Sequence, residues 1–298
     1  MPRISRARMI GIDWGTTGFR AYRLASGRVV DRREAACGII TIEPGGFEAA
    51  LRDQVGDWIK AGGGPILLAG MVGSRQGWIE APYLPCPAGA DELGAALLDV
   101  PCAGQRVAIV PGLRSFDPAG TPEVMRGEET QLAGLVAEMS TPGLACLPGT
   151  HSKWARIVDG RVTSFTTHMT GEVFAALRGH TILGRMMQDG PGDDAAFLDG
   201  VARTEQTGGL LHHLFGVRTL GLFDRLGERA AASYLSGLLI GHEIAAAEAQ
   251  GTVHLIGAPG LCRLYALALG QRRVRTVTAA ADIGAVGLAL IAERAGWV

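Results

Sequence analysis

Two segments of the chain share a pattern that suits phosphate binding, GTTGFRAYRLASGRV at residues 15–29 and GTHSKWARIVDGRV at residues 149–162. Each begins with Gly-Thr after an apolar run, reverses at Ser-Gly or Asp-Gly, and resumes with Arg-Val, which predicts a β-hairpin. A Gly-Thr turn presents backbone N–H groups and a hydroxyl to phosphate oxygens. The pair therefore predicts a polyphosphate held between two related domains. The alternative is two unrelated hairpins that share a glycine turn.

Only the first turn carries a carboxylate. Asp13 stands before it in DWGTT, where the second segment has Leu147. One carboxylate can hold Mg²⁺ through its water shell, so Asp13 is the predicted metal ligand. The alternative for Asp13 is that it only caps the turn. In the second hairpin, Lys153 could neutralise phosphate charge, and the alternative is a lysine on a strand that faces solvent. The predicted phosphate ligands are Gly15, Thr16, Thr17, Gly149, Thr150 and Lys153.

The segment RGEET supplies the predicted catalytic base. Phosphoryl transfer requires charge neutralisation, positioning and a group that accepts the proton of the attacking hydroxyl. Glu128 and Glu129 begin a predicted helix, whose N-terminal dipole favours ionised carboxylates. Ordinary helix capping is the alternative. The functional interpretation is favoured because this helix directly precedes the second phosphate-binding segment.

Composition limits the class of protein. The 298 residues allow one or two domains, and a hydrophobic content of 47% is ample for buried cores. A net charge of −1 argues against a nucleic-acid binder. The longest apolar stretches, 235–241 and 283–292, are shorter than the ~20 residues of a membrane span, so no membrane association is expected.

The cysteines indicate the compartment. They are scattered, without a CxxC pair or zinc spacing, which favours free thiols in a reducing cytoplasm. No secretory signal is predicted, because Asp13 interrupts the apolar run after the basic start, and residues 1–8 receive no role. A homodimer is left open. The five cysteines are Cys37, Cys86, Cys102, Cys146 and Cys262.

Predicted strands and helices alternate, which favours an α/β fold with antiparallel sheet edges. The predicted domains are residues 1–126 and 127–298. The predicted strands cover residues 8–13, 18–24, 28–35, 66–69, 106–110, 144–148, 253–256 and 273–277. The predicted helices cover residues 47–61, 127–139, 172–188, 193–206, 210–216, 227–250, 260–270 and 280–295.

Three motifs resemble those of the sugar kinase, heat-shock ATPase and actin superfamily. IGIDWGTTGFRAY is similar to its first phosphate motif, LPGTHSKWARI to its second, and VHLIGAPGLCRLYALAL to its adenosine motif. The resemblance implies two ribonuclease-H-like domains with an interdomain cleft, the first binding the sugar acid and one phosphate motif, the second the other phosphate motif and adenosine. It implies ATP and Mg²⁺ as cofactors. Gly257, Ala258 and Gly260 would lie against adenine, although a plain strand-to-helix loop also explains them.

Five further segments, LAGMVGSRQGW, VPGLR, MRGEETQ, PGTHSKW and MTGE, resemble the bacterial 2-dehydro-3-deoxygalactonokinases. That family phosphorylates its keto-deoxy sugar acid at the 6-hydroxyl with ATP. In related sugar kinases a GDQQ-like segment holds the base, and aligning its glycine with Gly127 selects Glu128. Glu129 is the second choice for the base, because the later glycine of this chain, Gly134, does not align with the pattern of those kinases. The family pattern MTGE falls at a predicted helix start, where Thr170 as N-cap with Glu172 in the first turn is a sufficient explanation.

A sugar-acid substrate implies a carboxylate, which suits an arginine fork. The candidates are Arg75, in the loop GSRQGW, and Arg126 beside the base. Gln76 and Trp78 are expected to complete the sugar site, although Trp78 also suits simple packing.

Other functions remain open from the sequence. They are a kinase for the gluconate-derived epimer or another sugar acid, a phosphohydrolase of the same fold, a nucleotide-dependent switch and a sugar-sensing regulator. The last two are disfavoured, because no extra interaction domain or N-terminal DNA-binding helix-turn-helix is expected in this chain.

Overall fold

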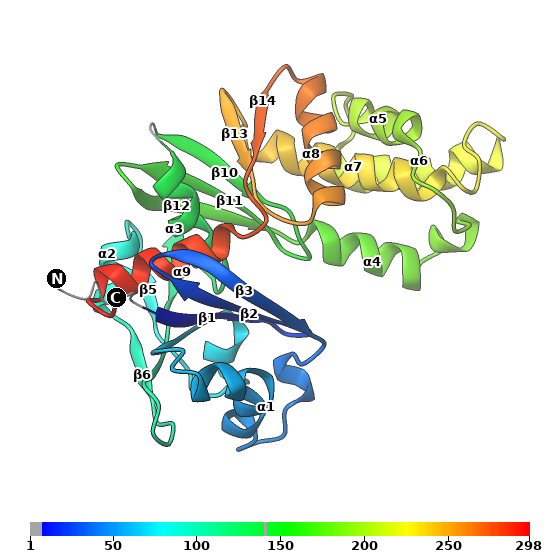
Figure 1. Cartoon of the computed structure of the whole chain (residues 1–298). Helices are drawn as coiled ribbons and strands as arrows, with labels where there is room; N and C mark the ends of the chain where they lie inside the picture. The colour runs from blue at the N-terminus through cyan, green and yellow to red at the C-terminus, as the bar shows by residue number, and fades with distance from the viewer. Residues whose placement is uncertain (1–7, 140–141) are drawn as a thin grey trace. The chain divides into compact units, whose positions relative to one another are not determined.

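The computed structural model describes residues 8–139 and 142–298, which form two compact units (Figure 1). Unit 1 comprises Met1–Pro142, Arg156–Phe165 and Ala280–Val298, and unit 2 comprises Gly143–Ala155 and Thr166–Ala279. Residues 1–7, to which the sequence assigns no role, lie outside the described part. The α/β class expected from the sequence is confirmed in both units.

The two units do not coincide with the expected domains, residues 1–126 and 127–298. Two helices after that boundary, α3 (Glu128–Glu138) and α9 (Ile283–Arg294), belong to unit 1. They cross so closely that a Cβ on Gly134 would lie 2.0 Å from the Ile283 carbonyl oxygen, and one on Gly287 would lie 1.7 Å from that of Thr130. Helix packing between segments far apart in sequence therefore decides the division.

Unit 1 is built on a six-stranded sheet of order β3-β2-β1-β4-β7-β6. The expected meander is present, antiparallel through β1, β2 and β3, and β1, β4 and β7 run parallel. Helices α1 (Phe47–Lys60) and α9 cover its two faces (Figure 1). The strands are β1 (Arg8–Trp14), β2 (Phe19–Ala25), β3 (Arg28–Ala35), β4 (Ile66–Ala69), β6 (Leu98–Val100) and β7 (Val107–Ile109).

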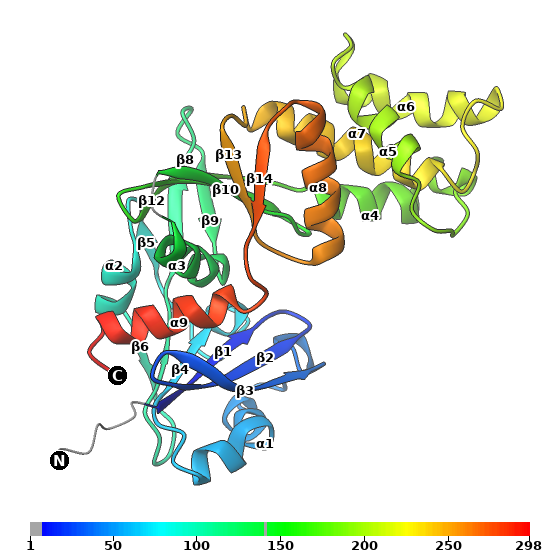
Figure 2. The same cartoon turned by 45° about the horizontal axis from the view of Figure 1, so that its top comes forward.

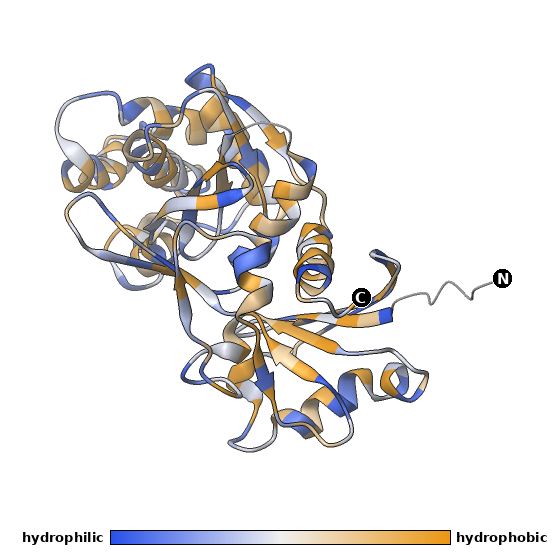
Figure 3. Cartoon of the chain, turned by 90° about the vertical axis from the view of Figure 1, so that its left-hand side faces the viewer, coloured by the Kyte–Doolittle hydropathy of each residue, from blue (hydrophilic) through white to orange (hydrophobic). Residues whose placement is uncertain are grey.

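The core of unit 1 follows from the sequence pattern. β4 is apolar and buried along its whole length, as expected for a central parallel strand. α1 buries Leu51, Val55 and Trp58 on one side, and these pack with Ile10 and Ile12 of β1. Figure 3 shows the central strands of this sheet as mostly hydrophobic and α1 as two-sided.

A second, three-stranded sheet in unit 1 has no counterpart in the prediction. Its order is β5-β8-β9, formed by β5 (Tyr83–Pro85), β8 (Gly112–Phe116) and β9 (Pro122–Met125). These strands are short and bounded by prolines, so their apolar alternation is too brief to recognise. They lead directly into α3 and thereby position Arg126. Helix α2 (Ala90–Ala95) follows β5.

Unit 2 is built on a five-stranded sheet of order β12-β11-β10-β13-β14. Strands β10, β13 and β14 run parallel. Helices α5 (Asp194–Arg203), α7 (Ala231–Ala246) and α8 (Pro259–Gln271) pack apolar side chains against this sheet. The strands are β10 (Gly143–Leu147), β11 (Ser152–Val158), β12 (Arg161–His168), β13 (Thr252–Leu255) and β14 (Arg275–Thr278).

The helices of unit 2 agree with the predicted ones in order and differ in extent. The expected helix at 172–188 ends at His180, and a separate short turn, Gly184–Met186, follows. The expected helix at 210–216 continues to Leu222. The helices are α4 (Thr170–His180), α5 (Asp194–Arg203), α6 (Gly209–Leu222), α7 (Ala231–Ala246) and α8 (Pro259–Gln271).

The two repeated segments fold alike. The first reverses at Ser26 and Gly27, with φ of 51° and 72°, and the second at Asp159 and Gly160, with φ of 49° and 74°. Two successive positive φ values are the hallmark of the tight turn that matches strand twist in a hairpin. The predicted hairpins and their turns are confirmed.

The five cysteines are free thiols, as expected. Within residues 8–139 and 142–298, no helix has the length and apolar character needed to traverse a bilayer.

Candidate active site

The first Gly-Thr turn follows β1 in unit 1. The Gly15 N–H donates to the Gly18 carbonyl at 2.9 Å, and the Ile39 N–H donates to the Gly15 carbonyl at 3.0 Å. The segment before Ile39 supports the turn so tightly that a Cβ on Gly38 would lie 2.2 Å from the Thr16 carbonyl oxygen. Thr16 and Thr17 are exposed. The turn is therefore fixed from one side and presents its hydroxyls on the other.

Asp13 lies at the carboxyl end of β1. Its side chain is 20% exposed, and Oδ2 lies 2.9 Å from Arg20 Nη2. Burial raises the pKa of this carboxyl, and the charge of Arg20 opposes the rise. At the end of β4, Gly70 has φ of 89°, and a Cβ there would lie 3.0 Å from Asp13 Oδ1. A glycine at this place keeps the second carboxylate oxygen uncrowded.

The two glutamates at the start of α3 have different surroundings. Glu128 is half-buried, and its Oε2 accepts the Arg126 N–H at 3.0 Å. Glu129 is 1% exposed, its Oε2 accepts the Gly127 N–H at 2.6 Å, and its Oε1 has no hydrogen-bond partner. Burial, and then the charge of Glu128, raises the pKa of Glu129 to about 8.

The geometry therefore favours Glu128 over Glu129 as a group that a substrate can reach. Glu129 lines a small internal cavity beside apolar side chains of α2, β8 and α3. Gly127, with φ of 106°, makes the sharp entry into the helix that separates the two carboxylates.

The two candidate arginines also differ. Arg126 is 9% exposed, donates from Nη2 to the Ala81 carbonyl at 2.7 Å and stacks over Tyr83 at 4.3 Å. Its Nε and Nη1 are buried without a hydrogen-bond partner. The side chain of Arg75 is 88% exposed and lies 3.6 Å from Glu80. A buried guanidinium with unused donors is the stronger anion ligand.

The remaining sugar-site candidates lie in the same loop as Arg75. Gln76 is exposed. Trp78 stacks on Phe47 with ring centroids 6.1 Å apart and packs against the core of unit 1. Packing, the alternative weighed for Trp78, accounts for its position.

In unit 2, the second Gly-Thr turn is supported by the first turn of α4. The Glu172 N–H donates to the Thr150 carbonyl at 3.0 Å, and the Glu172 carboxylate pairs with His151. A Cβ on Gly171 would lie 2.5 Å from the Gly149 carbonyl oxygen, so only glycine fits there. Lys153 is 6% exposed, which rules out the solvated lysine considered from the sequence.

A buried glutamate, Glu243 of α7, connects this turn to its surroundings. It accepts hydrogen bonds from Trp154 Nε1 and the Tyr265 hydroxyl, both at 2.7 Å, and from Thr170. Tyr265 also bonds Ser152 Oγ at 2.9 Å. The expected capping role of Thr170 is wrong, because Met169 is the N-cap of α4 and the Thr170 hydroxyl is used by Glu243.

The sequence offered only a weak signal for Glu243. It stands in a continuous apolar helix, where a lone carboxylate must find buried donors. Its three donors come from β11, α4 and α8, which only folding brings together.

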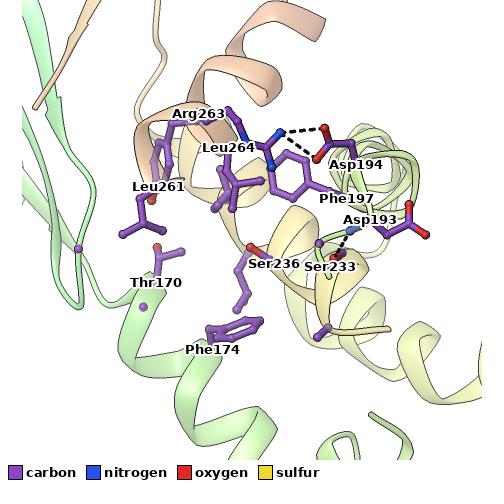
Figure 4. A pocket seen from close by; sticks show the side chains of 17 residues that line it. Thr170, Phe174, Asp193, Asp194, Phe197, Ser233, Ser236, Leu261, Arg263 and Leu264 are labelled. Atoms are coloured by element: carbon purple, nitrogen blue, oxygen red, sulfur yellow. Dashed lines mark hydrogen bonds and ion pairs between the residues drawn. The ribbon is translucent and has the colours of Figure 1, made fainter. Parts of the chain in front are cut away.

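A pocket of about 310 Å³ in unit 2 begins at the second turn (Figure 4). Gly149, Thr170 and Gly171 lie at one part of its wall, and apolar side chains from α4, α5, α7 and α8 form much of the rest. On its rim, Arg263 Nη1 donates to both carboxylate oxygens of Asp194, at 2.9 Å to Oδ1 and 2.8 Å to Oδ2. Its labelled lining residues include Phe174, Phe197, Ser236, Leu261 and Leu264.

The residues predicted to contact adenosine directly precede, in the sequence, residues of α8 that line this pocket. Gly257, Ala258 and Gly260 are exposed at the start of α8, and none of them is in the pocket wall. The wall uses Leu261, Leu264 and Tyr265, the following turn of α8. The helical spacing after GAPG could have pointed to them.

Within the described residues, no group of three or more His, Cys, Asp or Glu side chains is arranged to hold a metal ion. Asp13 stands as a single carboxylate, and its one ion-pair partner, Arg20, was not anticipated from the sequence. That donor set suits an ion bound mainly through water and phosphate oxygens.

Known proteins resemble this chain along most of its length. A family model described as 2-keto-3-deoxy-galactonokinase matches residues 13–291. A Rhizobium meliloti (strain 1021) protein named "Probable 2-dehydro-3-deoxygalactonokinase DgoK1" is 38% identical over 296 residues, covering 96% of each chain. The 2-dehydro-3-deoxygalactonokinase of Escherichia coli K12 is 36% identical over 239 residues, covering 80% of each chain.

A solved structure agrees with these relatives. The crystal structure of a Sinorhizobium meliloti protein described as a 2-dehydro-3-deoxygalactonokinase superposes with a TM-score of 0.89 at 37% identity, covering 97% of this chain and 99% of that one. The fold is therefore that of the sugar kinase and actin type, as the motifs implied. With the paired Gly-Thr turns, the acidic helix start and the family match taken together, the chain belongs to the 2-keto-3-deoxy-galactonokinase family.

Proposed function

We propose that the protein phosphorylates 2-dehydro-3-deoxy-D-galactonate at its 6-hydroxyl, using ATP and Mg²⁺, in galactonate catabolism in the cytoplasm. The observation that carries the proposal is the matched pair of Gly-Thr turns at strand ends, which accompanies the family match over residues 13–291. The names of the curated relatives support the sugar acid, and the five free thiols support the cytoplasmic location.

The nucleotide is assigned to unit 2. An apolar pocket of about 310 Å³ is of the size that accepts a nucleoside, and it begins at Gly149. The Gly149-Thr150 turn would donate N–H groups and a hydroxyl to phosphate oxygens, and the Lys153 ammonium would add positive charge. Gly257, Ala258 and Gly260 are assigned to the rim near the nucleoside.

The first turn is assigned to further phosphate contacts. Thr16 and Thr17 are exposed on a turn that Gly15 begins and that neighbouring backbone supports, so their hydroxyls would donate to phosphate oxygens. Asp13 would hold Mg²⁺ through water. When bound, the ion would neutralise charge on the phosphate oxygens of ATP. The fit rests on the burial of the Asp13 carboxylate at the end of β1, since a cation beside a buried carboxylate would stabilise its ionised form.

In the transfer step, the oxygen of the sugar-acid 6-hydroxyl bonds to the γ-phosphorus of ATP, the bond to the β,γ-bridging oxygen breaks, and ADP leaves. Glu128 accepts the hydroxyl proton. It is half-buried and lies at a helix start, where the dipole favours its ionised form. Glu129 is the second candidate base.

The substrate carboxylate is assigned to an arginine. Arg126 is favoured by its two buried donors without partners, and Arg75 is the alternative. Gln76 and Trp78 are retained as neighbours of the sugar acid.

The test is a coupled assay of ADP release with ATP and Mg²⁺, run without acceptor and with each of the keto-deoxy acids derived from galactonate and gluconate. We expect ADP release to require the galactonate-derived acid, with the product carrying phosphate at C6 by NMR. Equal rates without acceptor would instead indicate a phosphohydrolase. Preference for the other epimer would reassign the substrate within the same reaction.

A further inference from the structure

One edge of the pocket in unit 2 carries a carboxylate that a second helix holds in place. Helices α5, α7 and α8 lie together in this part of the unit (Figure 2). Asp194 is the first residue of α5, and Arg263 of α8 donates to its two oxygens from Nη1 at 2.9 and 2.8 Å. Both side chains are 52% exposed. These hydrogen bonds lower the pKa of Asp194, so its carboxylate is ionised at neutral pH and only accepts hydrogen bonds.

The neighbouring polar side chains of the pocket wall are engaged elsewhere or can serve either kind of ligand group. Asp193 uses its carboxylate as the N-cap of α5, accepting a backbone N–H of the first turn at 3.0 Å, and its own N–H donates to Ser233 Oγ at 3.0 Å. The Ser236 hydroxyl both donates and accepts, so it does not distinguish a donor from an acceptor. In Figure 4 Asp193 points away from the centre of the pocket, whereas the Asp194 carboxylate lies at its edge. Asp194 is therefore the side chain best suited to select a ligand that donates a hydrogen bond.

Asp194 and the second Gly-Thr turn belong to different parts of the pocket wall. Gly149 of the turn and Thr170 line the pocket, and in Figure 4 Thr170 and Asp194 lie on opposite sides of it. The wall also includes apolar side chains, among them Phe174 and Leu264, which suit a flat ring. A nucleotide with its phosphates at the turn would therefore place its base near Asp194.

We propose that Asp194 selects adenine by accepting a hydrogen bond from its 6-amino group, and that Arg263 holds the carboxylate in place for this contact. The inference rests on the proposed function, because it takes the nucleotide to occupy this pocket. Adenine has a hydrogen-bond donor at position 6, whereas hypoxanthine and guanine have an oxygen there. An oxygen that faces the Asp194 carboxylate would oppose two acceptors, which weakens binding. Because Arg263 uses only Nη1 for Asp194, the pair leaves its Nε and Nη2 to donate to a ring nitrogen of the base.

Isothermal titration calorimetry of the full chain with ADP and with IDP, both in the presence of Mg²⁺, tests the proposal without any turnover. At position 6 of the purine, ADP carries an amino group and IDP an oxygen. We expect the unaltered protein to bind ADP about tenfold to a hundredfold more tightly than IDP, the effect of one hydrogen bond to a charged group. Asp194→Asn should bring the two dissociation constants close together, because its amide can donate to the oxygen as well as accept from the amino group.

Two further variants test whether the effect belongs to this ion pair. Asp189→Asn is the matched control, since Asp189 also pairs with an arginine of unit 2, Arg178, but is not in the pocket wall. It should keep the preference for ADP. Arg263→Met keeps an apolar stem and removes the hydrogen bonds that hold Asp194, so it should lower the preference. Both nucleotides are titrated into the same preparation of each variant, so a loss of folded protein does not change the ratio of the two dissociation constants.

The outcomes separate this inference from the proposed function. Equal affinity of the unaltered protein for ADP and IDP, equal weakening of both nucleotides by Asp194→Asn, or a preference that Asp189→Asn also abolishes would each overturn the role of Asp194. A preference unchanged in Arg263→Met would overturn the positioning role of Arg263. If the preference behaves as expected but no phosphoryl group is transferred to either keto-deoxy acid, the proposed function fails and the selection of adenine stands.

Discussion

At the scale of single residues, the structure distinguishes members of two candidate pairs, the glutamates, of which the sequence ranked Glu128 first, and the arginines, which it left equivalent. Glu128 and Glu129 are neighbours with the same chemistry, yet one is half-buried and the other is 1% exposed. Arg75 and Arg126 were equal candidates, yet only Arg126 has buried donors without partners. Each pair can therefore be tested by comparing the same substitution at its two positions.

Asp13→Asn should keep the fold and lose most activity, because the change is nearly isosteric but removes the proposed Mg²⁺ ligand. Burial raises the pKa of Asp13, so its ionisation costs stability as pH rises above the unfolded value. The neutral variant should therefore be at least as stable as the unaltered protein at neutral pH. Turnover at saturating Mg²⁺ and thermal melting check both parts. Near-normal turnover would remove Asp13 from the site.

Glu128→Gln should lower kcat by about 10²–10⁴-fold and leave ATP binding intact, because general base catalysis has that magnitude. Glu129→Gln, the matched control, should be milder. If Glu129→Gln proves the more damaging change in single-turnover assays, the base is Glu129. The alignment of the kinase glycine with Gly127 would then be wrong by one residue.

The Glu129 variant also has a pH signature. The pKa of Glu129 is raised from 4.5 to about 8, so its folded form binds a proton that the unfolded form releases. Its contribution to stability is greatest below pH 4.5 and is lost as pH rises through about 8. Glu129→Gln should flatten the fall in unfolding free energy across this range. An unchanged pH profile in denaturant titrations would argue against a protonated Glu129.

Arg126→Ala should raise the KM for the sugar acid about tenfold to a hundredfold, the effect of losing a charged hydrogen bond of about 1.5–3 kcal/mol. Arg75→Ala is the control and should have a smaller effect, because that side chain is largely exposed. The KM for ATP should change little in either variant. If neither variant changes the sugar-acid KM, the substrate carboxylate binds elsewhere.

At the scale of elements, buried hydrogen bonds support the second Gly-Thr turn, which is proposed to bind phosphate. Glu243 joins α7 to β11, α4 and α8 through Trp154, Thr170 and Tyr265. Tyr265 and Thr170 also line the pocket. A change at Glu243 is therefore transmitted to the wall of the proposed nucleotide site.

Glu243→Gln should raise the KM for ATP and leave the KM for the sugar acid nearly unchanged. The amide replaces one acceptor oxygen with a donor, so one of three buried donors loses its partner. Glu248→Gln, at an exposed position just after α7, is the control. Equal changes in both KM values, or none, would show that the network does not act on the nucleotide site.

At the scale of the whole molecule, three separate segments complete unit 1. The close crossing of α3 and α9 joins the helix that begins with the proposed base to the last helix of the chain. Gly134 and Gly287 make the crossing possible, since neither position has room for a side chain.

Gly287→Ala should lower the melting temperature strongly, because its Cβ would overlap the Thr130 carbonyl and overpacking typically costs about 1–3 kcal/mol or more. Gly284→Ala on the same helix is the control, since its Cβ would meet only Gln131 Cγ at 3.5 Å. Thermal melting of both variants compares them. Equal stability of the two variants would mean that α9 can shift without cost.

The sequence by itself determined the local features of this protein. These features depend only on residues that are neighbours in the chain: the turns at Ser26-Gly27 and Asp159-Gly160, the apolar run of β4 and the Gly-Thr turns. The hairpins, the α/β class and the kinase motifs could therefore be predicted. The tertiary structure decided what depends on distant residues. The allocation of α3 and α9 to unit 1, the burial of Glu129 and Lys153, and the donors around Glu243 all arise from contacts between segments far apart in the chain, which local patterns do not encode.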